Sequence, residues 1–150
     1  MFAIIYGIRN FQKYTSMMTL LKRDKADYKI LITDDDDNCR SSLNDIFEPE
    51  GYTTYLASCG REAVEIAKHE LLHVLIMDVH MPDFSGFETV EFIKVEKKIQ
   101  IPCIFVSADT SKDLKFEAIE ADAYTLISKP INKEIIKYAV EQLLEKYYWK

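Results

Sequence analysis

Short apolar runs alternate with longer stretches of helical period from Lys29 to the end of the chain. Runs of this kind, bounded by polar or turn-forming residues, predict β-strands. The predicted strands cover residues 29–33, 53–57, 74–77, 103–107 and 126–128. Most are apolar at successive positions, as expected when helices cover both faces of a sheet. The alternation therefore predicts successive βαβ units and a parallel sheet of five strands.

The stretches between the strands repeat apolar residues at the three- and four-residue spacing of amphipathic helices. Five helices are predicted: around residues 43–47, after Gly60, from Ser85 and Gly86 onward, over about 111–121 and over about 133–148. Ser111 and Asp113 suit the first turn of the fourth helix, because hydroxyl and acidic side chains stabilise a helix start. At 150 residues, the chain is long enough for one domain with a sizeable core.

Polar residues follow four of the predicted strands. Asp34 and Asp35 begin a run of four aspartates after the first strand, Asp78 follows the third, Ser107 ends the fourth and Lys129 follows the fifth. Because crossovers between parallel strands are almost always right-handed, the carboxyl ends of the strands meet at one edge of the sheet. Ligands of open α/β sheets bind in the crevice beyond that edge. We therefore expect these five side chains to share one pocket.

The expected pocket has the chemistry of phosphoryl transfer around a divalent cation. Carboxylates a few ångströms apart raise one another's pKa, and a bound cation removes that conflict. Oxygen ligands without a Cys or His cluster favour Mg²⁺ or Mn²⁺ over zinc. Lys129 adds a positive charge and Ser107 a hydroxyl donor, which suit the oxygens of a phosphoryl group. Asp78, alone at its strand end, is the candidate nucleophile that would become an aspartyl phosphate.

Four segments resemble the receiver domains of two-component response regulators, over about residues 28–150. They are LITDDD with Asp34 and Asp35, LIMDVHMPDFSG with Asp78, FVSA with Ser107, and ISKP with Lys129. The resemblance implies that Asp78 accepts a phosphoryl group from a histidine kinase or a histidine phosphotransfer protein. We accordingly expect a flavodoxin-like (βα)5 three-layer sandwich with strand order 2-1-3-4-5.

The resemblance also implies a ligand set for Mg²⁺. Asp35, Asp78 and the backbone carbonyl of His80 would hold the ion, and Asp34 would act through a metal-bound water. Such a protein is a phosphoacceptor that assists its own phosphorylation and dephosphorylation, and it is not a turnover enzyme.

Phosphorylation would act as a switch, again by resemblance. Ser107 and Lys129 would swing toward the new phosphate, and the peptide bond between Lys129 and Pro130 would be cis. The fourth helix, fifth strand and fifth helix would form the output surface. Because no effector domain follows the fifth helix, we expect a stand-alone regulator that acts through protein contacts, with a homodimer as a further option.

Two features depart from the family pattern. The family usually places Tyr or Phe three residues before the lysine as a rotameric switch, but Leu126 stands there and Tyr124 lies five residues before. Either Thr125 and Leu126 are an insertion and Tyr124 is the switch, which we favour, or the chain has no aromatic switch. The second feature is the pair of tuning positions beside the path of attacking water.

The tuning positions hold His80, two residues after the nucleophile, and Asp109, two residues after the hydroxyl. A negative Asp109 would either orient water or repel the phosphate. The pair therefore predicts an altered phosphoryl lifetime of either sign.

The run of aspartates has two other interpretations. A calcium loop would need Gly at Cys39 and Glu at Asp45, and neither is present. A haloacid-dehalogenase-type Mg²⁺ phosphatase would use Asp34 as its nucleophile. That class would also want Thr or Val at Asn38 and an inserted cap, which this short chain lacks, so we keep it as the alternative function.

Charge separates the first 27 residues from the rest. The net charge of −6 argues against nucleic-acid binding, which needs a basic surface to displace counterions. Residues 1–27 carry five Lys or Arg against two Asp, whereas residues 28–150 carry 14 against 23. We expect residues 1–27 to be an added amphipathic helix or a disordered extension, and residues 28–150 to be the receiver domain.

Localisation follows from the cysteines and the apolar runs. The three cysteines have no metal-ligand spacing and do not suggest a disulfide framework, which fits a cytoplasmic setting. The apolar run 2–8 is too short to span a bilayer and has no basic flank ahead of it, so we predict neither a signal peptide nor a membrane anchor.

Overall fold

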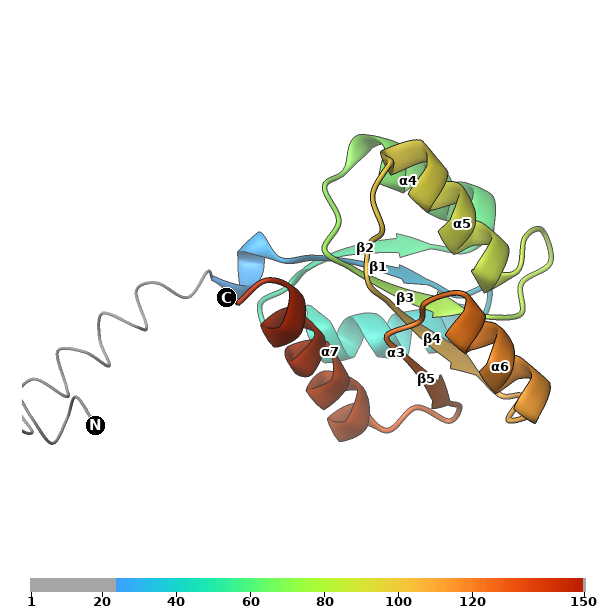
Figure 1. Cartoon of the computed structure of the whole chain (residues 1–150). Coiled ribbons are helices and arrows are strands. Elements are labelled where there is room, and N and C mark those ends of the chain that lie inside the picture. Colours follow the sequence, from blue (N-terminus) through green and yellow to red (C-terminus); the bar gives the residue numbers. More distant parts are fainter. Residues whose placement is uncertain (1–23, 150) are drawn as a thin grey trace, which may run out of the picture.

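The computed structural model describes residues 24–149 as one parallel sheet with helices on both faces (Figure 1). The strands are β1 (Lys29–Thr33), β2 (Thr53–Ala57), β3 (Val74–Asp78), β4 (Cys103–Ser107) and β5 (Thr125–Ser128). The helices are the 3-10 turn η1 (Lys25–Asp27), α3 (Asp37–Phe47), α4 (Gly60–His69), α5 (Gly86–Lys97), α6 (Lys112–Glu120) and α7 (Lys133–Tyr147). The strand order is β2-β1-β3-β4-β5, and every neighbouring pair is parallel. The predicted α/β fold and strand order are confirmed.

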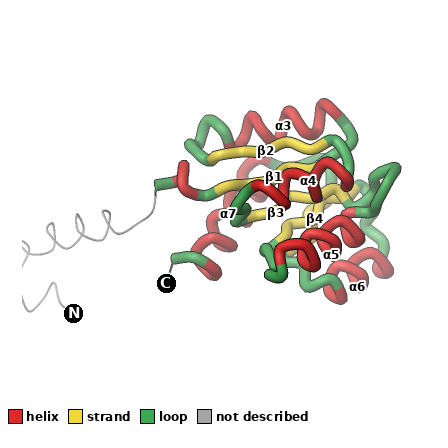
Figure 2. The backbone as a smooth tube through the Cα atoms, turned by 90° about the horizontal axis from the view of Figure 1, so that it is seen from above, coloured by secondary structure: helices red, strands yellow, loops and turns green. Residues whose placement is uncertain are grey.

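Alternation along each strand divides the core into two layers. Ile30 and Ile32 of β1 pack in a cluster with α3 and α7, whereas Leu31 packs in a second cluster with α4, α5 and α6. Successive strand residues point to opposite faces, so a strand that is covered on both sides must be apolar throughout. Figure 1 shows α4 and α5 on one side of the sheet and α3 and α7 on the other, and Figure 2 looks onto one face of the sheet with its strands side by side. This sandwich leaves the carboxyl ends of the strands free to carry polar groups.

Side chains just before the helices fix where four helices begin. Asp36 accepts hydrogen bonds from the first turn of α3, and Ser111 and Asn132 do the same for α6 and α7. Ser85 and Glu88 form a reciprocal capping box at the start of α5. These contacts satisfy backbone N–H groups that have no partner inside the helix. The caps lie in the loops after β1, β3, β4 and β5, so they also shape the edge where the polar residues gather.

Aromatic side chains close the opposite, amino-terminal edge of the sheet. The ring of Tyr28 lies 5.4 Å from that of His73, 6.0 Å from that of Tyr148 and 6.4 Å from that of Trp149. Tyr148 also donates a hydrogen bond to the carbonyl of His73 at 2.8 Å. Tyr148 and Trp149, just after α7, therefore cover the amino-terminal edge of the sheet. Tyr147, the last residue of α7, is 44% exposed.

Only part of the predicted N-terminal extension falls within the described residues. Residues 24–27 form η1 and its cap, and they are tied to the body by the ion pair between Lys25 and Glu50 and by the hydrogen bond from Thr53 to the Ala26 carbonyl. The prediction for residues 1–23 lies outside the described residues. Within residues 24–149, no helix has the length and apolar character needed to cross a bilayer.

The loop after β3 is held tightly against the helices that follow it. The Gly86 N–H donates to the Val79 carbonyl at 2.8 Å, and a Cβ at Gly86 would lie 2.3 Å from the Asp78 carbonyl oxygen. The Asp83 carboxylate accepts from the N–H groups of Gly60 and Arg61 at 3.0 and 2.8 Å. Although partial burial opposes it, these backbone hydrogen bonds lower the pKa of Asp83 to about 2. The loop thus joins the start of α4 to the start of α5 directly beside Asp78.

Replacing Gly86 by alanine tests this close approach. The added Cβ would force the start of α5 away from the Asp78 carbonyl, so we expect Gly86→Ala to lower the free energy of unfolding by about 1–3 kcal/mol. Urea denaturation followed by circular dichroism measures the change. Lys115→Ala, at an exposed position of α6, is the control and should stay within about 0.5 kcal/mol. Equal stabilities of the two variants would contradict the packing described here.

Candidate functional site

Three carboxylates meet at the carboxyl edge of the sheet. Asp34 directly follows β1 and Asp78 ends the neighbouring strand β3. Asp34, Asp35 and Asp78 each offer an oxygen atom within 4.8 Å of the others. Asp34 is fully buried and Asp78 is 5% exposed, whereas Asp35 is exposed. The structure therefore brings the three predicted acidic residues together.

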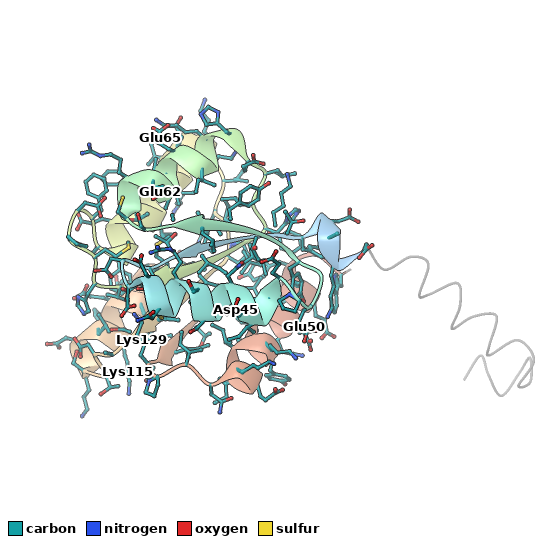
Figure 3. All side chains as sticks on the ribbon, turned by 180° about the vertical axis from the view of Figure 1, so that it is seen from behind. Asp45, Glu50, Glu62, Glu65, Lys115 and Lys129 are labelled. Atoms are coloured by element: carbon teal, nitrogen blue, oxygen red, sulfur yellow. The ribbon has the colours of Figure 1, made fainter. Side chains whose placement is uncertain are left out.

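Lys129 supplies the positive charge of this cluster. Its Nζ atom lies 2.9 Å from Asp34 Oδ2 and 3.3 Å from Asp78 Oδ1, and it arrives from the loop after β5. In Figure 3, Lys129 lies toward the end of the molecule where α3 begins. Although burial alone would lower it, the two carboxylates raise the pKa of Lys129 above its ordinary value. The ammonium group is therefore charged at neutral pH and partly compensates the acids.

The electrostatic conflict within the cluster concentrates on Asp78. Burial and then the charge of Asp34 raise the pKa of Asp78 to about 7, and Lys129 opposes that shift. Once Asp78 is ionised, three carboxylates face one lysine, and the cluster has an excess of negative charge. The site is therefore suited to accept further positive charge.

The donor set fits Mg²⁺ or Mn²⁺. The three carboxylates offer oxygen atoms, and no described Cys or His side chain joins their cluster. Asp34 Oδ2 is buried and accepts no well-aligned hydrogen bond, although Lys129 Nζ lies near it. Asp34 Oδ1 is already used, because it accepts from the Asp36 N–H at 2.9 Å. One buried acceptor therefore points into the cluster without a full set of partners.

Ser107 and Pro130 complete the predicted pocket. Ser107 ends β4, one residue beyond the Val106 that pairs with Asp78, and it is 1% exposed. Its carbonyl accepts from the Lys129 N–H at 2.9 Å, so the ends of β4 and β5 are joined at this edge. The bond between Lys129 and Pro130 is cis, as the resemblance implies.

The two tuning residues approach each other across the rim of the pocket. His80 Nε2 lies 3.8 Å from Asp109 Oδ2, with both side chains largely exposed. The Asp109 N–H donates to Ser107 Oγ at 3.0 Å, and Asp109 Oδ1 accepts from the Ser111 N–H at 2.8 Å. The hydrogen bond from the Ser111 N–H lowers the pKa of Asp109. Asp109 is therefore ionised, and hydrogen bonds to Ser107 and Ser111 hold it in place within the loop after β4.

Tyr124 is not brought to this site. The ladder between β4 and β5 is regular, since Phe105 pairs with Leu126 and Ser107 with Ser128, so no insertion interrupts the strand. Tyr124 precedes β5; its N–H bonds to Cys103 at the start of β4, and its ring lies 6.4 Å from that of Tyr147. Leu126, three residues before the lysine, pairs with Phe105. The role of Tyr124 as a switch stays a prediction.

Two residues that were not predicted from the sequence, Arg40 and Cys39, interact with Asp34. Arg40 Nη1 donates to the Asp34 carbonyl at 2.7 Å, and its other nitrogen pairs with Asp37. Cys39 lies one turn into α3 beside the Asp34 carboxylate, and burial followed by that carboxylate raises the pKa of its thiol to about 12. Neither contact could be predicted from motif spacing, because both depend on how α3 turns back over the aspartate loop.

The sequence of this chain matches the model of a known protein family. The model for the response regulator receiver domain matches residues 30–141, which is more than half of the chain. The chain belongs to the response regulator receiver family. The matched region contains each of the acidic, hydroxyl and lysine residues described above.

Known receiver-family proteins resemble the chain in sequence and in structure. Sporulation initiation phosphotransferase F of Bacillus subtilis is 33% identical over 117 residues, which are 77% of this chain and 93% of that protein. A receiver domain protein from Methanospirillum hungatei superimposes with a TM-score of 0.73 at 27% identity, over 82% of this chain and 98% of that one. The response regulator RR06 of Streptococcus pneumoniae is 27% identical over 79% of this chain, which spans only 54% of its length.

Membership in the receiver family decides between the two functions considered from the sequence. The chain is a receiver domain of two-component response regulators, and the haloacid-dehalogenase-type alternative is not supported. The geometry agrees, because Asp34 is fully buried and already contacts Lys129 and the Asp36 N–H. A nucleophile needs a face that is open to its substrate, and Asp34 has none.

The raised pKa of Asp78 predicts how stability depends on pH without a divalent cation. In the unfolded chain Asp78 ionises near its ordinary pKa of about 3.9, but in the folded protein it keeps its proton up to about pH 7. Its contribution therefore favours folding at low pH and is lost as pH rises from about 4 to 7. Between pH 5 and pH 8 we expect wild type to lose about 1–3 kcal/mol of stability relative to Asp78→Asn.

Chemical denaturation of both proteins across this range, with a chelator present, measures the difference. Comparing the two proteins cancels the titration of other groups. A saturating concentration of Mg²⁺ should abolish the trend, since the cation stabilises the ionised carboxylate. Parallel stability curves for the two proteins in chelator would contradict the assignment of this titration to Asp78.

Proposed function

We propose that this receiver domain is switched by phosphorylation of Asp78. The observation that carries the proposal is the convergence of Asp78 with Lys129, 3.3 Å apart, beside the carboxylates of Asp34 and Asp35. Asp78 is the member of this cluster that ends a strand alone and retains some exposure while lying against a cationic group. A carboxylate in such a setting can attack phosphorus while nearby groups neutralise the phosphoryl oxygens.

The phosphoryl donor would be a phosphohistidine of a histidine kinase or a histidine phosphotransfer protein. A carboxylate oxygen of Asp78 forms the new bond to phosphorus as the nitrogen–phosphorus bond of the donor breaks. The histidine nitrogen leaves with the bonding electron pair and is then protonated. Because each Asp78 accepts one group, the protein acts as a stoichiometric carrier or switch and does not turn over a substrate.

Mg²⁺, or Mn²⁺ in its place, would be held by Asp35, Asp78 and the backbone carbonyl of His80. Asp34 would contribute through a bound water. When present, the cation supplies positive charge next to the reacting phosphoryl group, which lowers the electrostatic cost of bringing it to the acids. The buried Asp34 Oδ2, which lacks an aligned hydrogen bond, supports this arrangement.

Lys129 and Ser107 would convert the new charge into a change of conformation. Lys129 now contacts Asp34 and Asp78, and Ser107 Oγ accepts from the Asp109 N–H. A phosphoryl group on Asp78 offers both side chains strong acceptors, so states in which they close on it become more populated. Since Ser107 ends β4 and Lys129 directly follows β5, their movement would change the loops that lead into α6 and α7.

The proposed output surface consists of α6, β5 and α7. Four apolar side chains on these helices are strongly exposed: Phe116, Ile119, Ile135 and Tyr138. A downstream protein with a complementary apolar surface would bind there. With Leu126 at the position of the usual aromatic, the coupling to this surface would run through the two loops and not through a rotating ring.

Intact mass spectrometry tests the phosphoacceptor directly. Incubation with acetyl phosphate and Mg²⁺ should add one phosphoryl group per chain, and chelator should prevent the addition. The added group should be lost on mild base or hydroxylamine treatment, as expected for an acyl phosphate. Asp78→Asn removes the nucleophile and should remain unmodified.

The matched control is Asp83→Asn, which changes an aspartate of the same loop outside the cluster. It should still accept one phosphoryl group. A modified Asp78→Asn protein, or an added group stable to hydroxylamine, would contradict the proposal. Repeated hydrolysis of a phosphoester that Asp34→Asn abolishes would also contradict it.

The pair formed by His80 and Asp109 predicts the persistence of the phosphoryl group. Since the two side chains lie 3.8 Å apart at the rim, we expect them to act on attacking water as one unit. His80→Ala and Asp109→Ala should then change the rate of phosphoryl loss by similar factors, and the double variant should change it no further. Rates from the decay of radiolabelled protein give the measurement, and strictly additive effects would exclude a joint action.

A further inference from the structure

Helix α5 carries apolar residues on its outer face as well as on its inner face. Val90 and Ile93 are buried against the sheet, as the fold requires. On the opposite side, Phe92 and Val95 are 44% and 68% exposed, and Ile99, just beyond the helix end, is 52% exposed. A surface helix usually presents charged or polar residues to solvent. This outer stripe of Phe92, Val95 and Ile99 is therefore a candidate protein-binding surface.

The stripe borders a groove between α5 and α4, which lie side by side on one face of the sheet (Figure 1). The groove has a volume of about 390 Å³, and its apolar lining consists of Val64, Phe84, Phe92 and Val95. The rings of Phe84 and Phe92 pack edge to face with centroids 4.9 Å apart. The face thus offers both protruding apolar side chains and a hollow that can receive such side chains.

Charge on this face is balanced and ordered along α5. The exposed charges in its first half are the acidic Glu88 and Glu91, whereas the exposed charges of its second half and C-cap are Lys94 and Lys98 with one acid, Glu96. The rim of the groove is also balanced, with Arg61 and Lys68 against Glu65 and Glu96. Such a surface does not attract a partner of strong net charge. It attracts a partner whose acidic and basic residues run in the opposite order, so that unlike charges face one another.

We infer that the outer face of α5 and the groove beside it bind a second copy of this chain in antiparallel orientation. A two-fold axis between Lys94 and Val95 places Glu91 of one copy opposite Lys98 of the other, twice, because the midpoint of residues 91 and 98 along the chain falls between residues 94 and 95. The same axis directs Ile99 of each copy toward the groove of the other. An isologous contact of this kind uses one patch for both partners, and this patch is complementary to itself.

Charge also argues against the chain's own first residues as the occupant. Residues 1–23, which lie outside the described part, contain Arg9, Lys13, Lys22 and Arg23 and no acidic residue. That segment would favour an acidic surface over the balanced one described here. The contact between copies does not rest on phosphorylation, and it lies on α5 and α4, apart from the proposed output surface.

The interface is small, because it is built from one helix and the rim of its neighbour. Interfaces at the low end of the size range form weak and reversible complexes. We expect a monomer–dimer equilibrium with a dissociation constant on the order of 10–100 μM, which corresponds to such a limited contact.

Sedimentation velocity of the full chain from about 1 to 300 μM tests the inference, a range that brackets the expected dissociation constant. Wild type should shift from monomer to dimer with rising concentration, and Val95→Asp should raise the dissociation constant at least about tenfold, since it buries a charge at the axis. Ile119→Asp is the matched control, because it places the same charge at an equally exposed apolar site on α6. It should dimerise as wild type does.

A charge reversal keeps the test decisive even if Val95→Asp misfolds. Glu91→Lys alone and Lys98→Glu alone should each weaken dimerisation about threefold to tenfold, since each sets like charges opposite one another. The double variant exchanges the two charges and should restore the wild-type constant. A wild type that stays monomeric at 300 μM overturns the inference, as does a dimer that Ile119→Asp weakens and Val95→Asp leaves intact. Failure of the double variant to restore affinity overturns the antiparallel pairing.

Discussion

The repulsion between Asp34 and Asp78, and its partial relief by Lys129, is the interaction on which the rest of the site depends. The parallel sheet delivers the two carboxylates to adjacent strand ends, where burial prevents water from screening them. Lys129 offsets part of this charge from 2.9 and 3.3 Å, and burial together with the remaining repulsion from Asp34 raises the pKa of Asp78. Such a cluster of carboxylates is suited to bind a cation, which under the proposed function would help it to accept a phosphoryl group.

The loops around the sheet hold this strained arrangement in place. Gly86 lies so close to the Asp78 carbonyl oxygen that no residue with a Cβ atom fits at this position. Asp83 ties the same loop to the first N–H groups of α4, and Arg40 fixes the carbonyl of Asp34 from α3. The contacts of Asp83 and Arg40 pair a charged side chain with backbone groups, so they position the loops after β3 and β1 without using the carboxylates that face the pocket.

The same groups connect the pocket to two separate faces of the molecule. Lys129 and Ser107 stand at the ends of β5 and β4, which lead to α7 and α6, where apolar side chains are exposed. The loop after Asp78 leads instead to α5 and to the outer stripe of Phe92, Val95 and Ile99. A charge added at Asp78 would therefore act on elements that border both the proposed output surface and the proposed contact between copies.

The sequence by itself determined the elements, their order and the five polar residues at the strand ends. Apolar runs covered on both faces, helical spacing between them and the handedness of parallel crossovers leave little freedom, because local patterning and chain connectivity decide these features. Only the tertiary structure decided that Tyr124 stays at the far end of β5, that Arg40 and Cys39 approach Asp34, and that Gly86 lies against the Asp78 carbonyl. These depend on strand register and on how helices pack back over loops, and neither is encoded in the spacing of residues along the chain.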